Sequence, residues 1–219
     1  MDVVVIVAAH NEAERLPATL GGLREAFPDA RVIVADDGST DETAALAREA
    51  GAEVVSTGRD IGKGGAMTEA ARRVDGFPLV VLCDGDLGAS ACHLPALADA
   101  VRDGRADLAV ATFAQRVGGG FGLAVDFARW AIRRLAGLEL GAPISGQRAM
   151  RAEVLSVVVP FAPRFGMETG MTIDAARAGF RVVEVPLDLE HRATGRTLRG
   201  FLHRGRQLAD FVAVVLDRR

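Results

Sequence analysis

The amino-acid sequence predicts one α/β domain, in which helices flank both faces of a mostly parallel sheet. Two observations indicate this class. Short runs of β-branched and apolar residues alternate with stretches in which apolar residues recur at helical spacing. The runs are apolar at successive positions, which is typical of strands buried on both faces of a sheet. Because parallel neighbours need crossover connections, we expect the intervening helices to cover the sheet.

The elements follow one another regularly in the first half of the chain. Strands are predicted at residues 3–8, 32–35, 54–56, 79–83 and 108–112. Helices are predicted between them at residues 12–26, 41–50, 64–74 and 91–101. Polar clusters follow the first, second and fourth strands, with the sequences AAHNEAE, DDGSTDET and CDGDLG. Since ligands collect at the carboxyl ends of parallel strands, these clusters predict a binding site at one edge of the sheet.

The second half of the chain is less regular. A glycine-rich stretch at 117–122 predicts a loop or hinge, and the helix after it carries apolar residues at Phe127, Trp130, Ala131 and Leu135. A further strand is predicted at 182–189, and an amphipathic helix at 198–216. The sequence contains neither an internal repeat nor a low-complexity linker, so we expect a single domain over residues 1–219.

Composition restricts the classes of function. The chain has 219 residues and a net charge of −3, so it lacks the basic excess of a protein that coats nucleic acid, and no nucleic-acid partner is expected. Cys83 and Cys92 have no zinc-site spacing and cannot build a disulfide framework, which favours a reducing, cytoplasmic environment. No apolar run approaches the roughly 18 residues that a membrane span needs.

Asp84 and Asp86 follow the predicted strand at 79–83 and are separated by one glycine. Two such carboxylates repel each other unless a proton or a cation lies between them. One interpretation is a site for Mg²⁺ or Mn²⁺, which take oxygen ligands and can bridge a diphosphate. The other is a turn and helix cap. The GKGG stretch favours the first, because Lys63 and backbone N–H groups ahead of a helix can face a phosphate.

Four motifs in order, VVVIVAAHNE, VIVADDGSTDET, GKGGAM and CDGDL, resemble the nucleotide-sugar domain of family 2 glycosyltransferases, which have the Rossmann-like GT-A fold. The likeness is strongest to dolichyl- and polyprenyl-phosphate sugar synthases. It covers residues 1–115, which it identifies as the nucleotide-sugar-binding half, and implies that residues 116–219 form the acceptor-binding half with a C-terminal amphipathic helix. Residues 161–192 are also similar to glucosyl-3-phosphoglycerate synthases.

This resemblance implies a role for each matching residue. Asp37 matches the acid that recognises the base, and Lys63 matches a lysine near the nucleotide phosphates. Asp84 and Asp86 match the D-x-D metal site, with Asp86 the firmer ligand, and His191 stands where the phosphoglycerate enzymes supply a histidine to the metal. A bound metal would neutralise the leaving diphosphate, which makes Asp86 a candidate catalytic residue. The stretch that contacts the nucleoside in the family corresponds to Ala8, His10, Asn11 and Glu12.

Activation of the acceptor has two interpretations. An alcohol acceptor needs a general base, for which Glu168 is the first candidate and Asp174 the second. The structural alternative for Glu168 is an acid at a helix start, where the helix dipole favours it. A phosphate acceptor, whose second pKa is about 6, can attack without a base. Gln147 and Arg148 could then hold the anion together with arginines near the C-terminus.

The C-terminal segment is strongly basic, with seven arginines between Arg192 and Arg219. The resemblance matches Arg192 to an arginine of the lipid-phosphate enzymes. A basic amphipathic helix can lie on an anionic membrane, which would suit a lipid acceptor and a peripheral location on the inner face of the membrane. Its apolar stripe can instead pack on the sheet, and the short second half leaves room for a homodimer contact.

The sequence therefore predicts a metal-dependent glycosyltransferase that moves a hexose from a UDP-glucose- or GDP-mannose-type donor to a phosphate-bearing acceptor, with polyprenyl phosphate first. The resemblance implies inversion for that acceptor, and retention if the likeness to glucosyl-3-phosphoglycerate synthases holds. One alternative is a sugar-phosphate nucleotidyltransferase, although the glycine-rich, arginine-containing loop expected after the first strand is absent. Another is a non-catalytic module that binds nucleotide sugars.

Overall fold

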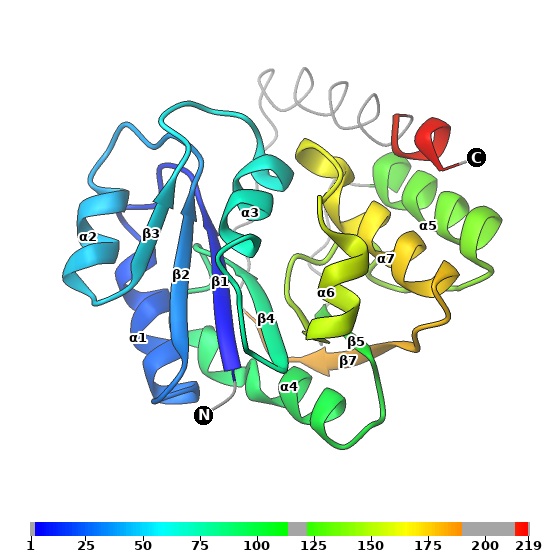
Figure 1. The fold of residues 1–219 in the computed structure, drawn as a ribbon, viewed down its shortest axis with the longest axis horizontal. Coiled ribbons are helices and arrows are strands. Elements are labelled where there is room, and N and C mark those ends of the chain that lie inside the picture. The colour runs from blue at the N-terminus through cyan, green and yellow to red at the C-terminus, as the bar shows by residue number, and fades with distance from the viewer. Residues whose placement is uncertain (1–2, 114–121, 190–212, 219) are drawn as a thin grey trace.

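A seven-stranded sheet forms the centre of the molecule (Figure 1). The computed structural model describes residues 3–113, 122–189 and 213–218. The strands are β1 (Val3–Ala9), β2 (Arg31–Asp36), β3 (Glu53–Ser56), β4 (Leu79–Asp84), β5 (Leu108–Phe113), β6 (Arg148–Arg151) and β7 (Val182–Leu187). The α-helices are α1 (Leu16–Ala26), α2 (Thr43–Glu49), α3 (Lys63–Ala71), α4 (Pro95–Arg102), α5 (Gly122–Ala136), α6 (Ala152–Val158) and α7 (Met167–Arg177). Short 3₁₀ segments precede α4 and α7, namely η1 (Gly88–His93) and η2 (Arg164–Gly166).

The strands lie in the order β3-β2-β1-β4-β6-β5-β7. Neighbouring strands are parallel except where β6 is involved, since β6 runs antiparallel to both β4 and β5. The predicted α/β class with a mostly parallel sheet is confirmed, and all six predicted strands are present. β6 is the strand that the sequence does not predict, because its four residues, RAMR, begin and end with arginine and contain no apolar run.

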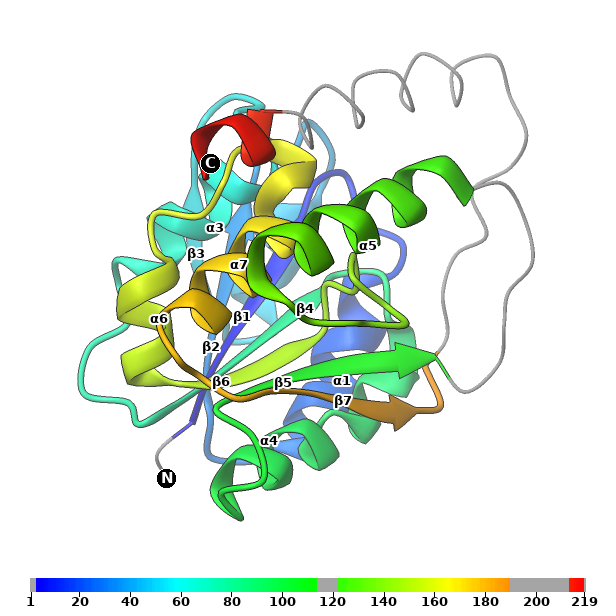
Figure 2. The ribbon, with the colours of Figure 1, turned by 90° about the vertical axis from the view of Figure 1, so that its right-hand side faces the viewer.

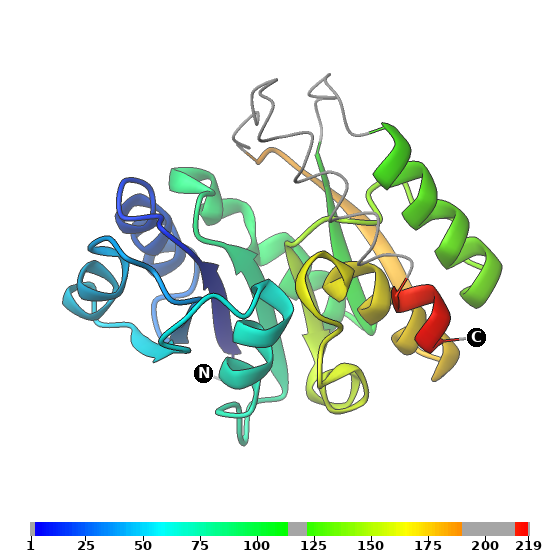
Figure 3. The same cartoon turned by 90° about the horizontal axis from the view of Figure 1, so that it is seen from above.

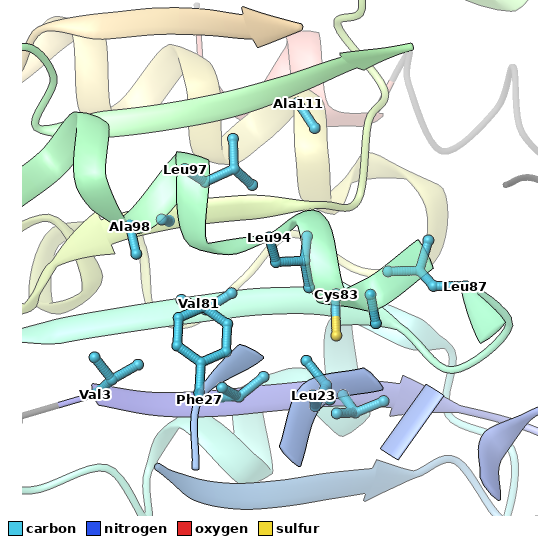
Figure 4. Close-up of a cluster of buried hydrophobic side chains, with 14 of the residues drawn as sticks. Val3, Leu23, Phe27, Val81, Cys83, Leu87, Leu94, Leu97, Ala98 and Ala111 are labelled. Atoms are coloured by element: carbon cyan, nitrogen blue, oxygen red, sulfur yellow. The ribbon is translucent and has the colours of Figure 1, made fainter. Parts of the chain in front are cut away.

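Both faces of the sheet are buried. In β1, Val3, Val5 and Val7 face a cluster that includes side chains of α1 and α4, whereas Val4 and Ile6 face a cluster with side chains of α3, α6 and α7. Figure 4 shows part of the first cluster, where apolar side chains fill the space between the sheet and its covering helices. Successive apolar residues in a strand therefore report burial on both sides, as the sequence pattern indicates.

A further layer lies outside α7. Ile132 of α5, Ile173 of α7 and Val214 of the C-terminal turn, a short helical turn at residues 213–217, belong to one buried cluster. Figure 2 shows α5 running in front of α7. Arg218 adds a two-pronged ion pair to Asp174, with Nε and Nη2 lying 2.7 and 2.6 Å from the two carboxylate oxygens. Seen from above, the C-terminal turn and α5 lie at the end of the molecule away from α1 and α2 (Figure 3).

The helices predicted at 41–50 and 64–74 are slightly shorter, at Thr43–Glu49 and Lys63–Ala71, and the other two predicted in the first half begin later than expected. The helix expected at 12–26 begins at Leu16, because residues 12–15 form a turn in which the Glu12 carbonyl accepts bonds from Arg15 N and Leu16 N. The helix expected at 91–101 is divided into η1 and α4, since Pro95 lacks an N–H and starts a new helix. Of the helix expected at 198–216, only residues from 213 onward lie within the described part. There Val215 is buried but Leu216, which belongs to the same predicted apolar stripe, is exposed, and Val214 packs with Ile132 of α5 and Ile173 of α7.

The sheet order places the predicted site. The chain proceeds from β1 outward to β2 and β3, then returns to β4 on the other side of β1. This reversal is a topological switch point, beyond which ligands bind at the carboxyl ends of the strands. β6 also begins at this edge, because its antiparallel register sets Arg148 opposite Leu82. Within the described residues, no helix is long and apolar enough to cross a membrane.

Candidate active site

The loops after β1 and β2 are tied together at the carboxyl edge. Asn11 N donates to Ser39 Oγ at 2.9 Å, and Asn11 Oδ1 accepts from Thr40 N at 2.8 Å. His10 Nδ1 lies 2.8 Å from the Asp37 carbonyl, which can only accept, so this nitrogen carries the proton and Nε2 accepts from the Asn11 amide at 3.1 Å. The predicted nucleoside-contact stretch therefore forms one hydrogen-bonded unit with the loop after β2.

Asp37 connects this unit to the loop after β3. Its side chain is buried, and Oδ1 accepts from Ile61 N at 2.8 Å. The neighbouring Gly38 has a φ of +69°, and a Cβ there would lie 2.4 Å from the Arg59 carbonyl carbon. Only glycine accommodates this conformation and this close approach without strain. The loop that leads to Lys63 is thus held against the end of β2.

Lys63, at the first turn of α3, lies between two carboxylates from distant parts of the chain. Its Nζ is 2.5 Å from Asp84 Oδ1 and 2.7 Å from Glu168 Oε1. Burial disfavours the charged ammonium, but the two carboxylates outweigh this effect and raise the pKa of Lys63 above its ordinary value. The Glu168 side chain is only 8% exposed, and the ammonium is its ion-pair partner there.

The segment before β6 completes the cluster. Because β6 is antiparallel to β4, Gln147 comes to lie beside the end of β4, and its amide donates to Asp84 Oδ2 at 2.8 Å. Gly146 lies closer still, since a Cβ at that position would be 2.5 Å from Asp84 Oδ2 and 2.7 Å from Lys63 Nζ. Gly146 is not among the site residues predicted from the sequence, because a single glycine in a loop carries no local signal of such a role.

We expect Gly146→Ala to lower activity about 10- to 100-fold, because an added methyl group must displace the Asp84 carboxylate or the Lys63 ammonium. The rate of nucleotide release from a sugar nucleotide measures this effect. Gly21→Ala is the matched control: no atom lies within 4 Å of a Cβ at Gly21, inside α1, so activity should be unchanged and stability should rise by up to about 1 kcal/mol. Equal activity of both variants would contradict the close packing of Gly146 on the cluster.

Asp86 differs from Asp84 in its surroundings. Its backbone carbonyl accepts from Arg15 Nη1 at 3.2 Å, but among the described residues its carboxylate has no hydrogen-bond or ion-pair partner. Gly85, between the two acids, is held by a 2.8 Å bond from its N–H to the Ala8 carbonyl, and its own carbonyl accepts from Thr19 Oγ1 at 2.7 Å. The backbone of the acid pair is therefore held in place by hydrogen bonds. The lone pairs of the Asp86 carboxylate accept no hydrogen bond from the described residues.

These residues suit a hard divalent cation. Asp84 and Asp86 supply carboxylate oxygens, the ligand type that Mg²⁺ and Mn²⁺ prefer, and such ions commonly complete their coordination with water and phosphate oxygens. No group of three or more His, Cys, Asp or Glu side chains arranged to hold a metal occurs in the described part of the chain. His191, the predicted third ligand, and Arg192 lie outside the described residues.

Arg148 takes a different place from the one that the sequence suggested. Its side chain is fully buried, and the guanidinium donates to Ser145 O at 2.9 Å, Thr172 Oγ1 at 2.9 Å and Pro143 O at 3.2 Å. Burial lowers the pKa of Arg148 to about 10, although the charges of Glu168 and Glu184 oppose the shift. A direct contact with an acceptor, and hence a catalytic role, has no support in this geometry, and the arginine instead joins the loop before β6 to α7.

The alternative base, Asp174, is engaged by its ion pair to Arg218, so neither side chain is available for an acceptor in this arrangement. Glu168 is the acid that α7 presents to the carboxyl edge, as its contact with Lys63 shows. The site residues from the first half thus converge at one edge, together with Gln147 and Glu168 from the second half.

Comparison with known proteins identifies the family of this chain. The family model described as glycosyl transferase family 2 matches residues 4–158, which include β1 to β6 and the acid pair. The chain is a family 2 glycosyltransferase. The transferase therefore has the activity class and the GT-A type of fold that its motifs suggested, and the expectation of an enzyme is confirmed.

The names of two relatives of the transferase refer to polyprenol-linked phosphates. It is 36% identical over 216 residues to an undecaprenyl-phosphate mannosyltransferase of Micrococcus luteus, covering 90% of this chain and 87% of that protein. It is 31% identical over 216 residues to a polyprenol monophosphomannose synthase of Mycolicibacterium smegmatis, covering 88% of this chain and 78% of that protein.

Solved structures provide a second comparison. The transferase matches glucosyl-3-phosphoglycerate synthase of Mycobacterium tuberculosis, in a complex with Mn²⁺, UDP and glucosyl-3-phosphoglycerate, with a TM-score of 0.80 and 27% identity. The match covers 99% of this chain and 79% of that one. The same enzyme, in complex with Mg²⁺ and UDP, matches with a TM-score of 0.81. Both likenesses that the motifs suggested are thus found.

Proposed function

We propose that this family 2 glycosyltransferase moves a hexose from a UDP-glucose- or GDP-mannose-type donor to polyprenyl phosphate. The observation that carries the proposal is the convergence of Asp37, Lys63, Asp84 and Asp86 at the switch point of the sheet, where a nucleotide diphosphate would lie. The relatives named undecaprenyl-phosphate mannosyltransferase and polyprenol monophosphomannose synthase favour that acceptor for this chain.

Each residue has a defined task in this proposal. Asp37 and the unit formed by residues 8–12 bind the nucleoside. Asp84 and Asp86 hold Mg²⁺ or Mn²⁺, which when bound supplies positive charge against the leaving diphosphate. Lys63 lies within reach of the phosphates, and Gln147 orients Asp84 through its 2.8 Å bond. Glu168 lies on the side of the cluster from which α7 approaches, where the sugar and acceptor would meet.

The direct test is a donor panel. UDP- and GDP-hexoses are incubated with Mg²⁺ or Mn²⁺, and release of the nucleotide is measured with polyprenyl phosphate, with 3-phosphoglycerate and without an acceptor. We expect release that requires both the divalent cation and polyprenyl phosphate. The anomeric configuration of the product, determined by NMR, should be inverted. A release that occurs with every donor and needs neither cation nor acceptor contradicts the proposal.

A second candidate is transfer to a small phosphorylated acid such as 3-phosphoglycerate. The structural match to glucosyl-3-phosphoglycerate synthase, over 99% of this chain, favours it. Stimulation by 3-phosphoglycerate alone, with a retained anomeric configuration, would identify this reaction. Membership of family 2 gives no support to the nucleotidyltransferase and non-catalytic alternatives.

Glu168→Gln distinguishes the two kinds of nucleophile. With polyprenyl phosphate we expect the rate to fall less than about tenfold, because an anionic phosphate needs no general base; loss of a required base typically costs about 10²- to 10⁴-fold. The turnover number at saturating acceptor measures the effect. Glu153→Gln, which changes an exposed acid in the first turn of α6, is the control and should behave as wild type. A loss of 10²-fold or more in the Glu168 variant alone would favour a hydroxyl acceptor.

Membrane contact through the C-terminal basic segment, a homodimer and a cytoplasmic location stay predictions. The segment at 190–212 lies outside the described residues, so its arginines carry no structural argument. Association of the protein with anionic liposomes, compared with neutral ones, tests the membrane contact.

A further inference from the structure

Lys63 is the only lysine in the chain, whose other 25 lysine-or-arginine positions are all arginine. The two side chains differ chemically at this point in the site. The guanidinium of arginine is a planar fork, whereas the ammonium of lysine is a compact point charge with three donors. A point charge can lie between oxygens that converge on it, much as a small metal ion does. Lys63 occupies such a position between Asp84 Oδ1 and Glu168 Oε1.

We propose that the Lys63 ammonium is an internal counterion of Asp84 that a divalent cation must displace, and that Lys63 stays tethered to Glu168 when this happens. The inference rests on the proposed function, because it takes Asp84 and Asp86 as the carboxylates that hold the metal. It adds a competition between a residue of the chain and that metal. In this role Lys63 is a positioning residue, acting through the two carboxylates it joins.

The contacts of Asp84 support the competition. Oδ1 lies 2.5 Å from the ammonium and Oδ2 accepts the Gln147 amide at 2.8 Å, so both oxygens already have a donor. A metal that binds Asp84 would lie beside these donors. The amide of Gln147 is neutral, whereas the ammonium and a divalent cation repel each other at short range. The ammonium is therefore the partner that must move.

The surroundings restrict where the ammonium can go. Gly146 packs over the Asp84 and Lys63 pair, so movement toward the loop before β6 is blocked by backbone. The second contact of Lys63, with the nearly buried Glu168, lies on the other side and remains in place. Asp86 has no side-chain partner within the described residues and can receive the incoming cation first. The displaced ammonium would then stay beside Glu168, close to where a diphosphate needs a positive charge.

A binding measurement without nucleotide tests this competition. Lys63→Met removes the ammonium that competes with the metal and keeps Asp84, Asp86 and Glu168. We therefore expect Mn²⁺ to bind about tenfold more tightly than in wild type. Free Mn²⁺ is measured by its electron paramagnetic resonance signal. Lys63→Arg keeps the charge and should retain the weaker, wild-type affinity. Unchanged or weaker Mn²⁺ binding in Lys63→Met overturns the proposal, and so does equal tightening in Lys63→Arg.

The matched control is Arg72→Met, which removes one positive charge just beyond the far end of the same helix. Arg72 is exposed and paired with Glu69. It follows nine helical residues, a distance of about 13 Å along the axis, where salt screens most of its effect on Asp84. Its Mn²⁺ affinity should match that of wild type. A tightening equal to that of Lys63→Met would show that net charge alone is responsible, and would overturn the proposal.

The unmodified protein offers an independent measurement, should Lys63→Met fail to fold. Because the chain has one lysine, labelling with ¹⁵N-lysine gives one side-chain ammonium signal in NMR. We expect this signal to shift in proportion to Mg²⁺ occupancy, determined by competition with Mn²⁺. A signal that stays in place while Mg²⁺ binds overturns the proposal.

These outcomes are separate from the test of the proposed function. If hexose transfer occurs and requires a divalent cation, but Lys63→Met leaves Mn²⁺ affinity unchanged, the counterion inference alone is wrong. If no divalent cation binds to wild type or to either Lys63 variant, with or without UDP, the assignment of Asp84 and Asp86 as a metal site is itself wrong.

Discussion

Asp86→Asn is expected to lower the rate of hexose transfer about 10²- to 10³-fold while leaving the fold intact. The physical reason is the loss of one negative charge that holds the cation at the leaving diphosphate. Stability should change by less than about 0.5 kcal/mol, because the carboxylate is half-buried and, within the described residues, accepts no hydrogen bond whose loss would cost free energy. Nucleotide release at saturating donor, with Mn²⁺ present, measures the rate.

The control for this variant is Asp99→Asn, which removes the same charge from an exposed position on α4, where Asp99 pairs with Arg102. Its transfer rate should equal that of wild type. Thermal unfolding of both variants establishes that they are folded. A wild-type rate in Asp86→Asn, with metal-dependent donor binding retained, would rule out the metal-holding role of this aspartate.

Arg148→Met is expected to lower the free energy of unfolding by about 3 kcal/mol. Two effects oppose each other here. Removing the buried guanidinium relieves the desolvation cost that lowers its pKa to about 10. However, three hydrogen bonds are lost, and the acceptors Ser145 O, Pro143 O and Thr172 Oγ1 are left in a buried environment. The lost bonds dominate, since each bond from a charged donor contributes about 1.5–3 kcal/mol.

For a protein of this length, such a loss corresponds to a fall of roughly 6–12 °C in the unfolding midpoint, which calorimetry measures. Arg151→Met is the matched control, because Arg151 lies at the other end of β6, is exposed and pairs with Asp107 at 3.2 Å. Its destabilisation should be under about 1 kcal/mol. Similar midpoints for the two variants would mean that the buried hydrogen bonds of Arg148 contribute little to stability.

Most of the site residues in the first half of the chain can be predicted from the sequence. Asp37, Lys63, Asp84 and Asp86 all lie next to predicted elements, and a parallel sheet brings the carboxyl ends of its strands to one edge. Their proximity therefore follows from alternation of strands and helices, without knowledge of any contact. The structure places each of them at that edge, although their roles in catalysis stay proposals.

The second half was harder to predict. Arg148 was expected at the acceptor, yet it is buried, because a short strand flanked by arginines gives no apolar signal that would reveal it as part of the core. The pairing of Lys63 with Glu168 joins residues 105 positions apart in sequence. No periodicity or local motif connects such residues, since their meeting depends on how α3 and α7 pack beside each other on the same face of the sheet.

Sequence alone determined that this chain forms a mostly parallel α/β sheet with acids and glycines at its carboxyl edge. The reason is that burial on both faces of a strand and helical spacing both appear as patterns among residues that are close in sequence. Only the tertiary structure decided that β6 enters this edge in reverse. The antiparallel direction of β6 brings Gln147 and Gly146 beside Asp84 and buries Arg148. The packing of α7 brings Glu168 into contact with Lys63. Such contacts depend on how distant elements pack, and packing is a property of the whole fold.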